Sequence, residues 1–130
     1  NLTAARAAAE AVAMRTGSSR VSAARLDLAS VASVMEFARE WEESDELLHV
    51  LVNNADYRGR AGDPLVTADG LERVVQVNHL SQMLLTELLT PVLSRSSPSR
   101  VVHVVSDAHR RGRPALEPKA VRGQEGAKGL

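Results

Sequence analysis

No cysteine occurs among the 130 residues of the chain. Disulfides, thiolate zinc sites and cysteine nucleophiles are therefore excluded. No apolar run reaches the roughly 18 residues that a membrane-spanning helix requires. Neither sign of charge is in excess, because 16 basic residues balance 16 acidic ones. The net charge therefore supplies no overall field that would attract nucleic acid or an anionic membrane.

The residues that are present have the composition of a soluble globular protein, with 44% apolar and 25% charged side chains. Their number fits one domain. The chain begins at Asn1, without an initiator methionine or an apolar signal region. We therefore expect an internal piece of a longer protein, and the sequence leaves its cellular location open.

The C-terminal residues differ from the rest. Residues 110–130 hold six basic and two acidic residues, four glycines and two prolines, without periodicity. This composition predicts a flexible basic tail, so the folded part of the chain is expected over residues 1–109.

Three helices are predicted from spacing and capping residues. The alanine-rich stretch 3–15 has a cap at Thr3 and a helix-ending glycine at Gly17. Ser30 caps a second helix, whose apolar residues recur at intervals of three and four. Apolar positions at helical spacing predict a third, long helix over 69–93.

Apolar runs between these helices predict three buried strands, at 21–28, 47–53 and 100–106. Helices and strands then alternate along the chain. Such alternation is typical of an α/β fold with a doubly wound parallel sheet and crossover helices.

Polar residues stand where the three apolar runs end, namely Asp27, Asn53, Asn54 and Ser106. In an open parallel sheet the ligand crevice lies beyond the carboxyl ends of the strands, so these side chains are expected to share one edge. Each of them alone is more typical of a turn or cap at a strand end, and only the four together favour a site.

Asn78 is the most informative single residue. It follows Leu71 by seven residues and precedes Leu85 by seven, which places it on the apolar stripe of the long helix. A buried amide needs partners. Neighbouring backbone is one source of them. Alternatively, the amide opens the helix locally and holds water or substrate.

Other candidate sites are weak. Ser106, Asp107 and His109 are too close in sequence for a nucleophile triad, and no G-x-S-x-G elbow surrounds the serine. His103 and His109 lack the spacing of a metal site, so no metal is predicted.

The chain resembles the short-chain dehydrogenase/reductase family, in its retinol-dehydrogenase-like branch. Four motifs carry the resemblance: LDL at 26–28, LVNNA at 51–55, DGLERVVQVNHL at 69–80 with LLT at 84–86, and RVVHVVSDAH at 100–109. It implies a partial Rossmann-like domain over 1–109, containing the family's third, fourth and fifth strands.

The resemblance also implies an NAD or NADP cofactor. Asp27 and Leu28 would lie near its adenine, and Asn53, Asn54 and Ala55 would pass beneath it.

Asn78 and Ser106 occupy the family's catalytic asparagine and serine positions. Ser106 would orient the oxygen of a small-molecule alcohol or carbonyl substrate, and Asn78 would hold a relay water. The retinol-dehydrogenase-like branch implies a retinol-like or other lipophilic substrate. The family also commonly forms homodimers through the helix at 69–93.

The sequence departs from the family at the motifs that complete its chemistry. It contains neither T-G-x-x-x-G-x-G nor Y-x-x-x-K, and its one tyrosine, Tyr57, is followed four residues later by Ala61. The displayed chain is therefore expected to be inactive. An alternative is a catalytically dead homologue that acts as a binding or dimerisation module.

Smaller departures from the family concern the residues expected to line the cofactor and substrate pockets. Asp56 replaces the glycine usual after Asn-Asn-Ala, which predicts weaker cofactor binding. Ser81, Gln82 and Met83 stand where glycine, histidine and an aromatic residue are usual, and Val105 replaces a serine. These four changes predict an altered substrate pocket.

The family's first two strands are missing, and they belong between the third and the fourth. If the third and fourth strands kept the positions they have in the family, an opening of about 14 Å would separate them, and no hydrogen bond between strands can cross it. We therefore expect residues 1–20 and the strand beginning at Val21 to be poorly held, and residues 47–109 to form the coherent unit.

Overall fold

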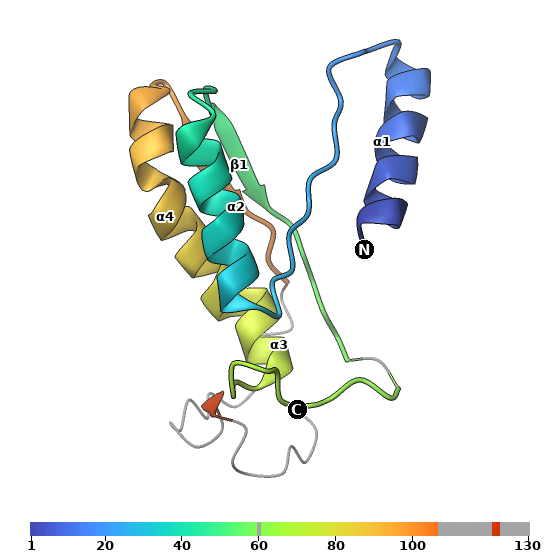
Figure 1. Ribbon diagram of the computed structural model, residues 1–130, viewed down its shortest axis with the longest axis vertical. Coiled ribbons are helices and arrows are strands. Elements are labelled where there is room, and N and C mark those ends of the chain that lie inside the picture. The colour runs from blue at the N-terminus through green and yellow to red at the C-terminus, as the bar shows by residue number, and fades with distance from the viewer. Residues whose placement is uncertain (60, 107–120, 123–130) are drawn as a thin grey trace.

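The computed structural model describes residues 1–59, 61–106 and 121–122 (Figure 1). Most of the tail predicted over 110–130 lies outside the described residues, as do Asp107 and His109. In chain order, the elements are α1 (Leu2–Thr16), α2 (Val31–Glu43), β1 (Val50–Asn53), α3 (Arg73–Val75), the π-helix η1 (Gln76–Leu80), α4 (Ser81–Arg95) and β2 (Arg100–His103).

The sheet consists of β1 and β2, which pair in parallel with Val50 opposite Arg100 and Asn53 opposite His103. The chain crosses from one strand to the other through α3, η1 and α4. This arrangement confirms a partial, Rossmann-like α/β fold, with two of the three predicted strands.

The third predicted strand, at 21–28, does not form. This segment is irregular and ends in a turn before α2. An extended segment becomes a strand only when a neighbour accepts its backbone hydrogen bonds. The expected neighbour of this segment, the family's second strand, is absent from the sequence, so the apolar run has no ladder to join.

The first two helices agree with prediction except at one cap. Ser30 caps α2 by accepting a hydrogen bond from Ser33 N, and Gly17 ends α1 in the left-handed conformation with φ of 66°. The cap of α1 is Asn1 and not Thr3, because the Asn1 side chain accepts from the backbone of residues 3 and 4. No residue of α1 is buried.

The long helix predicted over 69–93 is divided. It starts at Arg73 after the cap Glu72, because Thr67 to Glu72 form a turn around Gly70. It then widens into the π-helix η1 and continues as α4 to Arg95. Among the described residues, no helix is both long and apolar enough to cross a membrane.

The core lies between α2, α4 and one face of the sheet. Its buried residues are Val34 and Ala38 from α2, and Leu85, Leu89, Val92 and Leu93 from α4. Leu51 and Val101 pack against them from the strands. In Figure 1, α2 and α4 lie on one side of β1 and α1 lies on the other.

The other face of the sheet carries valines that remain exposed. Val50, Val52, Val102 and Val104 alternate with the core-facing residues and are 41–53% exposed. We call these four residues the open valine face. A strand that is apolar on both faces is typical of a sheet covered on both sides.

Candidate functional site

The carboxyl ends of β1 and β2 lie at the same edge of the sheet. The two strands are parallel and in register, and Val104 N continues the ladder by donating to Asn53 O at 3.0 Å. Asn54 and Ser106 therefore leave the sheet at one edge, and both are exposed. We refer to this edge as the carboxyl edge.

Asn53 and Asn54 differ in surroundings although they are neighbours. Asn53 is 5% exposed, and its Nδ2 donates to Thr86 Oγ1 at 2.9 Å and lies 3.3 Å from His103 Nδ1. Its side chain thus joins β1 to β2 and α4. Asn54 and Ala55 are exposed, so a ligand can reach both of them.

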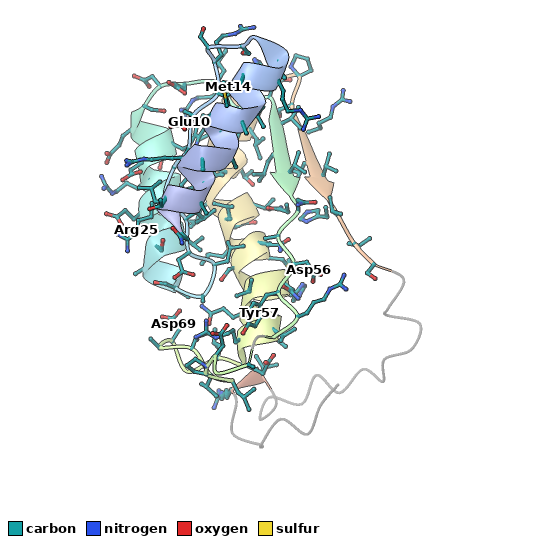
Figure 2. The ribbon with its side chains drawn as sticks, turned by 90° about the vertical axis from the view of Figure 1, so that its right-hand side faces the viewer. Glu10, Met14, Arg25, Asp56, Tyr57 and Asp69 are labelled. Atoms are coloured by element: carbon teal, nitrogen blue, oxygen red, sulfur yellow. The ribbon has the colours of Figure 1, made fainter. Side chains whose placement is uncertain are left out.

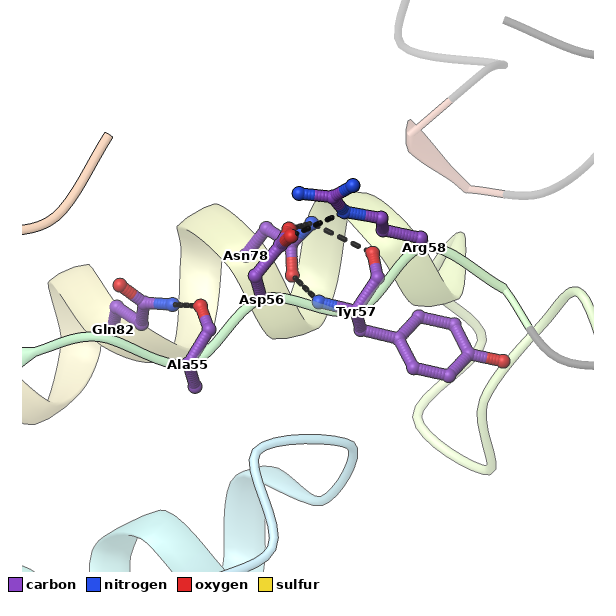
Figure 3. Close-up of polar contacts among 6 residues, drawn as sticks. All are labelled: Ala55, Asp56, Tyr57, Arg58, Asn78 and Gln82. Carbon is purple, nitrogen blue, oxygen red and sulfur yellow. Dashed lines mark hydrogen bonds and ion pairs between the residues drawn. The ribbon is translucent and has the colours of Figure 1, made fainter. Parts of the chain in front are cut away.

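Asn78 lies in η1, half-buried, and binds the segment that follows β1 (Figure 3). Its Oδ1 accepts from Tyr57 N at 2.7 Å, and its Nδ2 donates to Tyr57 O at 2.8 Å and to Asp56 Oδ1 at 3.3 Å. Neighbouring backbone therefore satisfies this amide. The helix also opens locally here, because Asn78 is the middle residue of the π-helix.

Asp56 brings a negative charge to this segment, and Arg58 balances it. Arg58 Nε donates to Asp56 Oδ2 at 2.7 Å. This hydrogen bond and the charge of Asp56 raise the pKa of the Arg58 guanidinium above its usual value. Both side chains are exposed, so the pair is weak.

Tyr57 is turned away from the edge. Its hydroxyl donates to Asp63 Oδ2 at 2.8 Å, and the Arg73 guanidinium lies 6.0 Å from the centre of its ring. In Figure 3 the ring extends away from Gln82. The hydroxyl is thus bonded to a carboxylate, which is not the arrangement of a tyrosine assisted by lysine.

Asp27 and Leu28 form the turn before α2. Asp27 Oδ1 accepts from Ala29 N at 2.9 Å, as a turn-forming aspartate does. Leu28 O accepts from Ser81 Oγ at 2.7 Å. This bond joins the turn to the start of α4, the same helix that contacts the segment after β1.

A family model described as short chain dehydrogenase matches residues 1–118. The chain belongs to the short-chain dehydrogenase family.

Curated relatives place the chain in the retinol-dehydrogenase-like branch of the short-chain dehydrogenases. WW domain-containing oxidoreductase from Gallus gallus is 47% identical over 91 residues, which cover 70% of this chain and 22% of the relative. Retinol dehydrogenase 11 from Mus musculus is 43% identical over 99 residues, covering 75% and 30%. Dehydrogenase/reductase SDR family member 13 from Bos taurus is 43% identical over 109 residues, covering 82% and 27%. The chain thus spans less than a third of each of these relatives.

Two residues at the start of α4 bind distant segments of the chain and were predicted only as changes to the substrate pocket. Ser81 and Gln82 are buried, and Gln82 Nε2 donates to Ala55 O at 2.8 Å. The signal for this role was present in the sequence, since polar side chains on the apolar stripe of a helix need partners.

A second set of polar residues, also missed, surrounds Asp69, which is labelled in Figure 2. Gln76 is fully buried, and its amide contacts Thr67 Oγ1 and donates to Asp69 Oδ2 at 2.6 Å. Asp69 Oδ2 also accepts from Val31 N at 2.8 Å. Among the residues that the structure describes, no group of three acidic or histidine side chains is arranged to hold a metal ion.

Proposed function

We propose that this chain is part of an NAD(P)-dependent oxidoreductase that interconverts an alcohol and a carbonyl on a lipophilic, retinol-like substrate. The observation that carries the proposal is the carboxyl edge: Asn54 and Ser106 follow two paired parallel strands, and Asn78 binds the segment after β1 at Tyr57. Two relatives support the substrate class, since they are named retinol dehydrogenases.

The exposure of Asn54 and Ala55 at the carboxyl edge supports dinucleotide binding. Asp27, at the turn before α2, is also exposed, and its Oδ1 accepts from Ala29 N. In this proposal Asp27 and Leu28 hold the adenine side, while Asn53, Asn54 and Ala55 run beneath the cofactor. The cofactor, when bound, supplies the hydride chemistry.

The proposed catalytic roles belong to Ser106 and Asn78. Ser106 lies exposed on the edge, where its hydroxyl would orient the substrate oxygen. Asn78 fixes the segment at Tyr57, and the relay water assigned to it stays a prediction. We expect the displayed residues alone not to turn over, because Tyr57 Oη is bonded to Asp63 and no Y-x-x-x-K pair is present.

The experiment begins with the complete transcript, which should encode T-G-x-x-x-G-x-G before these residues and Y-x-x-x-K after them. The protein made from it is titrated with NADH and NADPH, and saturable binding of one of them is expected. Ser106→Ala should then lower kcat by about a hundredfold or more and leave the dinucleotide Kd unchanged. A complete protein that binds neither dinucleotide refutes the proposal.

A catalytically dead homologue that acts as a binding or dimerisation module is the second candidate. The observation in its favour is a groove of about 520 Å³ between α2 and α4, lined by Met35, Ala38 and Leu88 among others. Met35 and Met83 are more than half exposed on these helices. A transcript without the two motifs, together with a dimer in sedimentation, favours this candidate over the enzyme.

A further inference from the structure

The first two residues of α4 each donate a side-chain hydrogen bond to the backbone of a different distant segment. Ser81 Oγ donates to Leu28 O at 2.7 Å, and Gln82 Nε2 donates to Ala55 O at 2.8 Å (Figure 3 shows the second bond). Ser81 is 1% exposed and Gln82 is 7% exposed. Both bonds are therefore partly shielded from competing water.

These bonds differ from the hydrogen bonds that polar side chains commonly make to the backbone of their own helix. Thr86 and Thr90, further along α4, donate to the carbonyls four residues before them, at 2.8 and 2.9 Å. Such bonds stay within the helix. Ser81 instead donates across to Leu28 O, and the carbonyl four residues before it, that of Val77, accepts from Gln82 Nε2 at 3.2 Å.

Adjacent helical residues point in directions about 100° apart, so neighbours on one helix reach two different segments. Ser81 reaches the turn before α2, and Gln82 reaches the segment after β1. Because both residues belong to the same rigid turn of α4, they fix the position of the two segments relative to each other.

Each bond also orients a peptide plane. A peptide unit is planar, so a bond to its carbonyl sets the direction of the following N–H. Ser81 thereby orients the N–H of Ala29, which donates to Asp27 Oδ1 at 2.9 Å. Gln82 orients the peptide between Ala55 and Asp56 in the same way.

We propose that Ser81 and Gln82 are positioning residues for the dinucleotide, holding Asp27 and the Asn54–Ala55 segment at the spacing that the cofactor needs. This inference rests on the proposed function. It assigns a role to two residues that differ from the glycine and histidine usual at these places in the family. A glycine at position 81 has no hydroxyl to give to Leu28 O.

The test uses Ser81→Ala and Gln82→Met in the protein made from the complete transcript, with Thr90→Ala as the matched control. Each of the first two leaves a carbonyl without its donor, and we expect the Kd of NADH or NADPH to rise about tenfold. At saturating dinucleotide, kcat should change much less than KM for the cofactor. Thr90→Ala, on the exposed side of α4, should change neither.

Amide hydrogen exchange of the same variants without cofactor provides the second measurement. Ser81→Ala should speed exchange at Ala29, and Gln82→Met at Asp56, each without affecting the other position. An unchanged dinucleotide Kd despite these local changes overturns the positioning role, and so does exchange that rises throughout the protein. If the parent protein binds no dinucleotide, the proposed function fails and the positioning role fails with it, even where local exchange still responds.

Discussion

Asp69 accepts two hydrogen bonds through a single carboxylate oxygen, from Val31 N at 2.8 Å and from Gln76 Nε2 at 2.6 Å. The first bond satisfies a backbone donor at the start of α2, and the second satisfies an amide that is fully buried. We expect Asp69→Ala to lower the free energy of unfolding by about 1–2 kcal/mol, because both donors lose their acceptor. Urea denaturation of the two proteins measures the difference.

Glu10→Ala is the control for this substitution. It also removes an exposed carboxylate, from a helix that buries no residue, and should change the stability by less than about 0.5 kcal/mol. Equal effects of the two substitutions would show that Asp69 contributes only its charge.

At this scale the sequence predicted the end of β1 at Asn53, because a strand that turns polar marks its own end, but β2 ends at His103, before Ser106. Asp27 was predicted at the same edge as the end of a third strand, but residues 21–28 form no strand and Asp27 lies at the turn before α2. The bonds from Asn78 to Tyr57 were not predicted, because they depend on the path of the loop after β1, which no local pattern encodes.

At the scale of the elements, the backbone amides of β1 should be protected from hydrogen exchange much more strongly than those of residues 21–28. The backbone oxygens of His49 and Asn53 accept hydrogen bonds from Arg100 N and Val104 N. Residues two apart on a strand face the same neighbouring strand, so the N–H of Leu51, which lies between them, faces β2 as well. No ladder involves Leu26, which lies in an irregular segment. We expect amide exchange at Leu51 to be slower than at Leu26 by more than about tenfold, measured by NMR.

Leu89, 1% exposed in the middle of α4, supplies the reference for full protection. Equal protection of Leu26 and Leu51 would mean that residues 21–28 are held as firmly as the sheet. The sequence-based expectation of a loosely held N-terminal part would then be wrong.

The elements that depend on local signals were predicted well, and those that depend on neighbours were not. Ser30 and the apolar stripe after it are enough to define α2. The strand at 21–28 needed a partner that the sequence does not contain. The regular spacing from Leu71 to Asn78 also misled, because Leu71 lies in a turn and the helix widens at Asn78.

At the scale of the whole molecule, the balanced charge and the open valine face both favour association between copies of the chain. The chain has no net charge at pH 7 and a pI near 7.1, so electrostatic repulsion between copies is smallest at neutral pH. Among the residues that the structure describes, β1 pairs only with β2, so the open valine face lies beside an unpaired strand edge, a combination that favours association. We expect light scattering of the purified chain to be greatest near pH 7.

Two variants of equal charge separate these causes. Val52→Lys adds a positive charge on the open valine face, and Ala7→Lys adds the same charge on the exposed surface of α1. Val52→Lys should reduce scattering at pH 7 far more than Ala7→Lys. Equal reductions would assign the association to net charge alone.

The π-helix at Gln76–Leu80 sets the direction in which the later side chains of the helix face. A π turn contains one residue more than an α turn. If the same residues formed a regular helix instead, every later side chain would be rotated by about 100°. Ser81 and Gln82 would then face away from Leu28 and Ala55, although no residue of either pair had been substituted. The extra residue of the π turn therefore brings both donors to their acceptors.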